Sequence, residues 1–293
     1  MAGMALRRSR RALLLATLAA PLSAPLPARG QQRLGVVASF SILGDFVRTL
    51  AGDQVALTVL LGPEAEPHDF APRPSAAVAV RSAALVLRNG LGLEPWMDRL
   101  LRAAPPRGRL LTLGEGISPL ALGAGPDPHA WLDPQRAGTY LRATAAALAG
   151  LGLAPAEAPA QGQMAALDVW LAGQFAAIPA ERRVFAVGHA GFGYLAARYG
   201  LRMLTPPAGA HGGQASAAAL AGLVAAVRAA RLAAVFSSGP EDAALMRRVA
   251  AEAGVPLAGR LYAETLSAGD GPAASYDALM RHNAQLLVAA MAG

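Results

Sequence analysis

Three histidines occupy positions from which they could bind one metal ion together. His68 and His129 each follow a proline, which restricts the loop backbone, and His189 comes two residues after the apolar run Val184–Val187. Neutral imidazole is a ligand that suits zinc, and also iron, nickel and copper. The spacings of 61 and 60 residues match no local metal-binding motif, so a shared site depends on the fold bringing the loops together.

The elements around these histidines are expected to form an α/β fold. Short apolar runs alternate with amphipathic stretches, which is typical of βαβ units with parallel sheets covered by helices. We expect two lobes, residues 31–150 and 180–293, each a roughly four-stranded, mostly parallel sheet flanked by helices. Residues 151–179 are expected to form a long rigid linker helix, because a helix of ~20 residues spans ~30 Å. Since ligands bind at the carboxyl ends of strands, the metal site is expected in the cleft between the lobes.

Several residues are expected to support these elements and the site. Ser75 is expected to cap a helix that runs to about Arg81, and Pro134 to open another helix. Three carboxylates could accept the second N–H of a ligand imidazole, although the last could equally cap the helix that follows it: Asp69, Asp127 and Asp133. Four aromatic residues are expected to pack beneath the ligand loops or wall off the ion: Phe70, Trp131, Phe192 and Tyr194.

The first 30 residues predict a cleaved secretory signal peptide. Four arginines between positions 7 and 11 precede an apolar stretch at 12–20, and small, proline-rich sequence follows to Gly30. The pattern fits general secretory or twin-arginine export, with cleavage near Ala28 or Gly30. The sequence contains no cysteine, which excludes disulfides, thiolate metal sites and a lipid-bearing cysteine. We therefore expect a soluble periplasmic protein that is not a lipoprotein.

The charge of the chain gives no indication of nucleic-acid binding. The formal net charge is +7, and five arginines fall in the expected leader, which carries no acid. The remaining chain is close to neutral and poor in aromatic residues, so it lacks the basic surface that nucleic-acid binding requires. No complete nucleotide-binding or serine-hydrolase motif is present.

Six ordered segments make the chain similar to a known family. They are Val36–Asp45, Pro67–Pro74, Asn89–Trp96, Asp127–Pro134, Leu261–Ser267 and Ser275–Tyr276. With these segments, the sequence from about Leu34 to the C-terminus resembles the substrate-binding proteins of zinc and manganese ABC importers, the ZnuA/TroA-like (cluster 9) group. The resemblance implies two lobes joined by a rigid helix, with one metal ion in the cleft between them.

The resemblance also implies a ligand set. The first three ligands of the family map to His68, His129 and His189. The fourth is usually an aspartate in a Tyr-x-Asp-Ser-Leu-Ser segment, where this chain has Glu264, one methylene longer. Asp270 or a water molecule could take the place of Glu264.

The third ligand position bears on the identity of the metal. Manganese-type members usually have glutamate there and zinc-type members histidine, so His189 favours Zn²⁺, which suits three nitrogens and one carboxylate. The resemblance implies a monomer that delivers zinc to a membrane permease with its cytoplasmic ATPase, with a zinc-donating periplasmic chaperone as a further candidate partner. It implies no catalysis.

Three alternatives stay open. The first is Mn²⁺ or Fe²⁺ binding within the same family. The second is a zinc hydrolase that uses the three histidines and an open site for water, with Glu264 as general base. The third is an adhesin, which nothing in the sequence supports.

Two further histidines are expected at the surface. His211 lies in a glycine-rich loop, where it could also contact the metal or a partner during loading, and His282 lies on the terminal helix.

Overall fold

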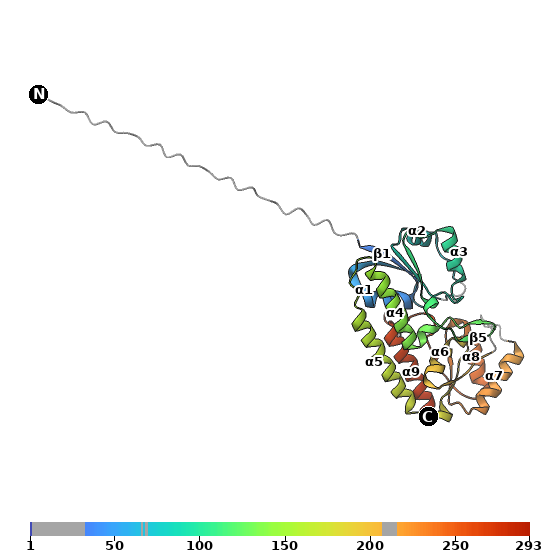
Figure 1. The fold of residues 1–293 in the computed structure, drawn as a ribbon. Helices are drawn as coiled ribbons and strands as arrows, with labels where there is room; N and C mark the ends of the chain where they lie inside the picture. Colours follow the sequence, from blue (N-terminus) through green and yellow to red (C-terminus); the bar gives the residue numbers. More distant parts are fainter. Residues whose placement is uncertain (2–32, 66, 68–69, 207–215) are drawn as a thin grey trace. The chain divides into compact units, whose positions relative to one another are not determined.

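The computed structural model describes Met1 and residues 33–65, 67, 70–206 and 216–293 (Figure 1). The expected leader after Met1, together with His68, Asp69 and His211, therefore lies outside the described residues. Residues Arg33–Gly293 form one compact unit. The division of this unit into lobes at residues 150 and 180 remains a prediction.

A four-stranded parallel sheet begins the compact unit, as the alternating pattern predicts. Its strand order is β2-β1-β3-β4, so the first strand is central. Val36 on the first strand is paired with Leu57 on one side and Leu85 on the other. The strands are β1 (Leu34–Phe40), β2 (Val55–Leu61), β3 (Leu85–Arg88) and β4 (Arg109–Thr112).

Helices cover both faces of this sheet, because successive side chains of a strand point to opposite faces. Val36 and Ala38 lie in the main core with residues of α1 (Ser41–Ala51) and α4 (Pro134–Ala149). Val37 lies in a separate apolar cluster with residues of α2 and α3. The bounds of these two helices are Pro74–Ser82 for α2 and Pro95–Ala103 for α3.

The strands of the second half form short parallel ladders. One ladder pairs β7 with β8, the other pairs β9 with β10, and a single parallel bridge joins Val187 to Phe236. The expected strands are thus present, but the ladder between the two pairs is reduced to this bridge within the described residues. The elements are β7 (Val184–Ala186), α6 (Gly193–Tyr199), β8 (Arg202–Leu204), α7 (Ala217–Ala229), β9 (Val235–Ser237), α8 (Pro240–Ala253) and β10 (Leu257–Arg260).

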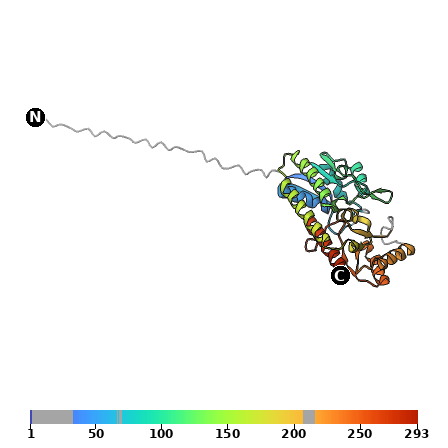
Figure 2. The ribbon, with the colours of Figure 1, turned by 60° about the horizontal axis from the view of Figure 1, so that its bottom comes forward.

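Two long helices each contact elements from both halves of the chain. Helix α5 (Glu157–Ala176) has 20 residues and packs against α1, α4, α6 and α9. Helix α9 (Tyr276–Ala292) closes the chain and packs against α5, β7 and β10. Figures 1 and 2 show α4, α5 and α9 side by side from two directions. Between β4 and α4 lies a small antiparallel hairpin of β5 (Ala121–Leu122) and β6 (Gly125–Pro126).

The helix caps confirm one expectation and correct another. Asp133 caps α4, because its carboxylate accepts the N–H of Gln135 at 2.9 Å. Ser75 does not cap α2, which begins one residue earlier at Pro74. Proline at the first helical position supplies the required φ angle and has no N–H to satisfy, so the helix starts without a side-chain cap.

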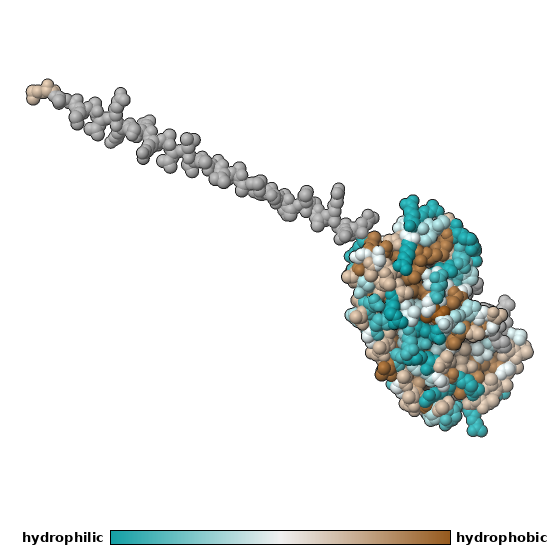
Figure 3. Space-filling view, in the orientation of Figure 1, coloured by the Kyte–Doolittle hydropathy of each residue, from teal (hydrophilic) through white to brown (hydrophobic). Residues whose placement is uncertain are grey.

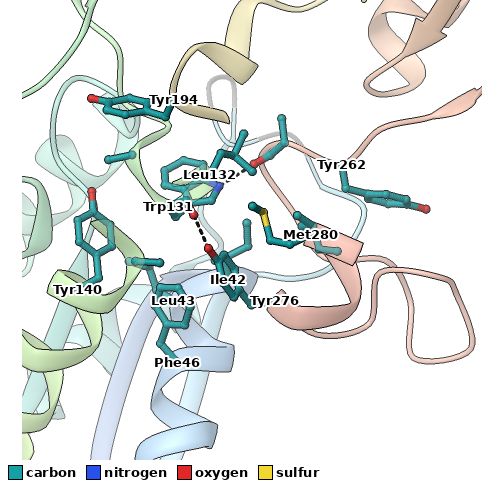
Figure 4. Close-up of a cluster of buried hydrophobic side chains, with 14 of the residues drawn as sticks. Ile42, Leu43, Phe46, Trp131, Leu132, Tyr140, Tyr194, Tyr262, Tyr276 and Met280 are labelled. Atoms are coloured by element: carbon teal, nitrogen blue, oxygen red, sulfur yellow. Dashed lines mark hydrogen bonds between the residues drawn. The ribbon is translucent and has the colours of Figure 1, made fainter. Parts of the chain in front are cut away.

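The main core surrounds Trp131 (Figure 4). This side chain is fully buried, and its Nε1 donates to the carbonyl of Ala263 at 2.7 Å. The Tyr276 hydroxyl, on α9, donates to the Trp131 carbonyl at 2.6 Å. The core therefore joins the loop after His129 both to the terminal helix and to the segment that carries Glu264.

The exposed surface mixes polar and apolar residues. Hydrophilic and apolar residues are interspersed over the face shown in Figure 3. Large hydrophobic side chains that are exposed within the compact unit include Val78, Leu110 and Val169. Of the helices in the described part of the chain, none combines the length and apolar character needed to cross a membrane.

Candidate metal centre

Three of the side chains singled out from the sequence converge on one point. Glu264 Oε1 lies 3.0 Å from His129 Nε2 and 3.1 Å from His189 Nε2. The two histidine Nε2 atoms are 3.2 Å apart. Each residue thus offers one ligand atom, and the three atoms lie within 4.8 Å of one another. The chain segments involved are 60 and 135 residues apart, so only the tertiary fold creates the site.

His129 is held by its neighbour Asp127. The carboxylate Oδ1 of Asp127 accepts the backbone N–H of His129 at 3.0 Å and lies 2.7 Å from Nδ1 of the ring. Because an ionised carboxylate only accepts hydrogen bonds, Nδ1 carries a proton and Nε2 faces the other two side chains. Asp127 therefore has the supporting role expected from the sequence, and orients a potential ligand through its far nitrogen.

His189 reaches the site from the start of a helical turn. It immediately precedes the 3₁₀ turn Ala190–Phe192, which leads into α6. Its side chain is 15% exposed, against 1% for His129, so the site is more accessible from the side of His189. The two rings meet edge to face, with centroids 5.0 Å apart.

Glu264 lies in a loop whose backbone is anchored on both sides. Trp131 binds the carbonyl of Ala263, and the Ser41 hydroxyl accepts the N–H of Leu266 at 2.9 Å. Asn283 on α9 both accepts from Tyr262 N–H and donates to the Tyr262 carbonyl, at 2.8 and 2.7 Å. These bonds fix a loop without regular secondary structure, so the carboxylate is presented in a defined position.

The electrostatics of the three side chains favour a cation. Burial lowers the pKa of His129, but the hydrogen bonds and negative charges of Asp127 and Glu264 outweigh it and raise the pKa to about 9. At neutral pH the imidazole therefore keeps a proton on Nε2, facing Glu264, as well as the Nδ1 proton that Asp127 accepts. A divalent ion at the same point would replace the Nε2 proton and bind Glu264 in its place.

A buried polar network behind His129 was not foreseen as such from the sequence. Glu94 is 3% exposed and accepts hydrogen bonds from the Ser39 hydroxyl at 2.5 Å and from Asn89 and Gly90 N–H, each at 2.9 Å. Burial raises the pKa of Glu94 despite these bonds. The side-chain amide of Asn89 donates to the Pro128 carbonyl at 3.0 Å, so the network fixes the backbone just before His129. The only sequence signal was that Asn89–Trp96 matches a family segment.

The other candidate ligands are placed as follows. His68 lies outside the described residues, but Pro67 beside it accepts a hydrogen bond from Trp96 Nε1 at 2.7 Å. His211 also lies outside them. Asp270 is exposed and does not belong to the converging group, and His282 instead contacts the carbonyl of Arg260 at 3.0 Å.

The aromatic residues expected around the site are buried with one partial exception. Phe70 is half-buried and packs edge to face on Trp96 at 4.9 Å. Trp131, Phe192 and Tyr194 are each at most 1% exposed. Of these, Trp131 packs edge to face on His129 at 5.4 Å, and His189 and Glu264 are the more accessible members of the converging group.

Comparison with known sequences identifies the family. The family model described as "Zinc-uptake complex component A periplasmic" (ZnuA) matches residues 36–290. The chain is 30% identical over 266 residues to the iron-binding protein YfeA of Yersinia pestis, covering 87% of this chain and 85% of that protein. It is 29% identical over 267 residues to the manganese-binding lipoprotein MntA of Halalkalibacterium halodurans, with 88% of each covered.

Solved structures agree on the fold. The periplasmic zinc-binding protein TroA of Treponema pallidum superposes with a TM-score of 0.78 at 24% identity, covering 88% of this chain and 99% of that one. The family model, over residues 36–290, spans all three converging side chains and all of the parallel sheet except the first two residues of β1. The chain therefore belongs to the ZnuA/TroA family of periplasmic metal-binding proteins of metal ABC transporters.

Proposed function

We propose that this protein captures Zn²⁺ through His68, His129, His189 and Glu264 and delivers it to the permease of an ABC importer. The observation that carries the proposal is the convergence of His129 Nε2, His189 Nε2 and Glu264 Oε1. The family consists of substrate-binding proteins and not of enzymes, which excludes the zinc-hydrolase alternative. The ion is then a cargo that is held and released, without any chemical change.

The donor set supports zinc as the cargo. Tetrahedral Zn²⁺ with bonds of about 2.0–2.1 Å keeps its ligand atoms about 3.4 Å apart. The three observed separations of 3.0, 3.1 and 3.2 Å are slightly shorter, so small outward movements of the rings would admit the ion. Imidazole-rich sites suit Zn²⁺ better than Mn²⁺, which prefers oxygen ligands.

His68 completes the proposed site as its third imidazole. The described residues on either side of it support this assignment. Glu64 N–H donates to the carbonyl of Leu266 at 3.1 Å, so the chain passes beside the Glu264 loop four residues before His68. After it, the Phe70 ring packs on Trp96.

A second candidate cargo is favoured by the relatives. The similar proteins from Y. pestis and H. halodurans are named for iron and manganese, at identities as high as any zinc-named relative described above. Fe²⁺ or Mn²⁺ is therefore the alternative cargo for the same side chains. Competition between the three ions for the metal-free protein decides between them.

The cellular setting of the proposed function follows from sequence and family. We propose that residues 1–30 direct export and are removed, that residues 31–150 and 180–293 act as two lobes, and that the helix within 151–179 links them. The word "periplasmic" in the description of the family supports the periplasm as the proposed compartment. The sequence has no cysteine to carry a lipid, so the protein is proposed to act without a lipid on cysteine, and the family resemblance implies a monomer. Its partners are the permease, with the cytoplasmic ATPase behind it, and a zinc-donating periplasmic chaperone.

The proposal is tested by titrating the metal-free protein with Zn²⁺ against a chromophoric chelator. We expect one tight site per chain, lost in His129→Ala and retained in His282→Ala, which removes a histidine of α9 that contacts Arg260 and the Tyr262 ring but is not one of the converging side chains. An unchanged titration of His129→Ala would overturn the proposal. Preferred binding of Mn²⁺ in the competition would transfer the function to the alternative cargo.

A further inference from the structure

The hairpin before His129 contains a side-chain hydroxyl in place of a backbone hydrogen bond. Strands β5 and β6 pair Ala121 with Pro126, so Leu120 and Asp127 form the next pair. Asp127 N–H donates directly to the Leu120 carbonyl at 2.7 Å. The return bond is not direct: Leu120 N–H donates to the Tyr194 hydroxyl at 3.0 Å, and this hydroxyl donates to the Asp127 carbonyl at 2.9 Å.

This hydroxyl connects the two loops that carry the histidines. Tyr194 lies on α6, five residues after His189, whereas Asp127 comes two residues before His129. The side chain of Tyr194 is 1% exposed, and the guanidinium of Arg136 covers its ring at 4.9 Å. The ring is therefore held by burial and by Arg136, and its hydroxyl by two hydrogen bonds at the end of the hairpin.

The connection continues from Asp127 to the ligand ring. The carboxylate of Asp127 binds both the N–H and the Nδ1 of His129. A displacement of the Asp127 backbone would thus be passed to His129 Nε2, the atom that meets His189 and Glu264. These hydrogen bonds therefore couple the position of the His129 ring to α6, the helix that follows His189.

We propose that the Tyr194 hydroxyl is a positioning group that sets the separation of the two histidine loops for the metal ion. The inference rests on the proposed function, since it concerns the same site. Without the hydroxyl, Leu120 N–H and the Asp127 carbonyl either stay unpaired or bond directly. Direct bonding would draw Asp127 towards Leu120 and away from α6, and unpaired groups would leave it loosely held. Both outcomes displace or loosen His129.

The test compares Tyr194→Phe with Tyr199→Phe. Tyr199 lies on the same helix and is buried to a similar degree, but its hydroxyl donates to Asp168 on α5 at 2.9 Å and does not touch the hairpin. In the chelator competition with Zn²⁺ we expect Tyr194→Phe to bind about 10- to 100-fold more weakly and to release the ion faster, as for other groups that orient metal ligands. Tyr199→Phe should bind like the wild type.

A second measurement reports directly on the hydrogen bond. Amide hydrogen exchange at Leu120 should be slow in the wild type and in Tyr199→Phe, and faster in Tyr194→Phe. Wild-type affinity in Tyr194→Phe, or an equal loss in Tyr199→Phe, would overturn the inference. If Tyr194→Phe does not fold, rapid exchange of the Leu120 amide in the wild type would overturn it instead. A wild type that binds no metal refutes the proposed function itself, which separates the two failures.

Discussion

Zinc binding should release a proton from His129 at a pH where an ordinary histidine has none to release. The pKa of His129 is raised to about 9 because Asp127 and Glu264 outweigh the effect of burial. At pH 8 a group with this pKa is about nine-tenths protonated, whereas a histidine of pKa ~6.5 is only a few per cent protonated. Each ion bound through Nε2 must displace that proton. We therefore expect about 0.9 proton released per Zn²⁺ at pH 8.

The same reasoning fixes the sign and slope of the pH dependence. Since metal and proton compete for His129, the apparent zinc affinity should rise nearly tenfold per pH unit between about pH 7 and pH 9 and level off above it. Calorimetric titration in buffers of different ionisation enthalpy measures the protons, with a chelator buffering the free zinc. Asp127→Asn, which removes one of the charges that raise the pKa, should release fewer protons at pH 8. Proton release near zero in the wild type, with flat affinity from pH 7.5 to 9, would refute the assignment.

Three further results follow from the site. Protonated His129 should stabilise the metal-free protein fully below the ordinary histidine pKa of ~6.5. As the pH rises through 9, the free energy of unfolding should fall by about 3 kcal/mol. Urea unfolding at a series of pH values across this range measures the loss. Zinc at a thousand times its Kd should add about 4 kcal/mol and raise the melting temperature by about 8–16 °C, and a chelator should reverse the shift. Trp131→Phe leaves the Ala263 carbonyl without its donor. It should lower the free energy of unfolding by about 1–3 kcal/mol, measured by heat or urea, and weaken zinc binding. If neither changes, this hydrogen bond does not hold Glu264 in place.

Much of the fold could be predicted because its signals are local. The apolar run at Val55–Leu61 and the prolines that open α3, α4 and α8 define element ends within a few residues. The error at Ser75 has a local cause as well, since Pro74 could begin the helix by itself and a serine cap was unnecessary. The reduced pairing between β7 and β9 could not be foreseen, because the length of a ladder depends on how helices hold neighbouring strands.

The site was harder to predict than the fold, since its members are close only in three dimensions. His129 and His189 are 60 residues apart, and no spacing rule joins them. Only the resemblance to a family indicated that Glu264, and not a nearer carboxylate, would join them. The hydrogen bonds that orient these side chains are even harder to predict from the sequence. Ser39 and Glu94 are 55 residues apart, and neither residue type indicates by itself that the side chain has a buried partner.

The order of the three converging residues along the chain has a consequence for biogenesis. Glu264 is the last of the three to be made, 75 residues after His189. A nascent polypeptide that still lacks this segment cannot assemble the centre. The three side chains can therefore come together only after synthesis has passed Glu264, however early the preceding helices and strands fold.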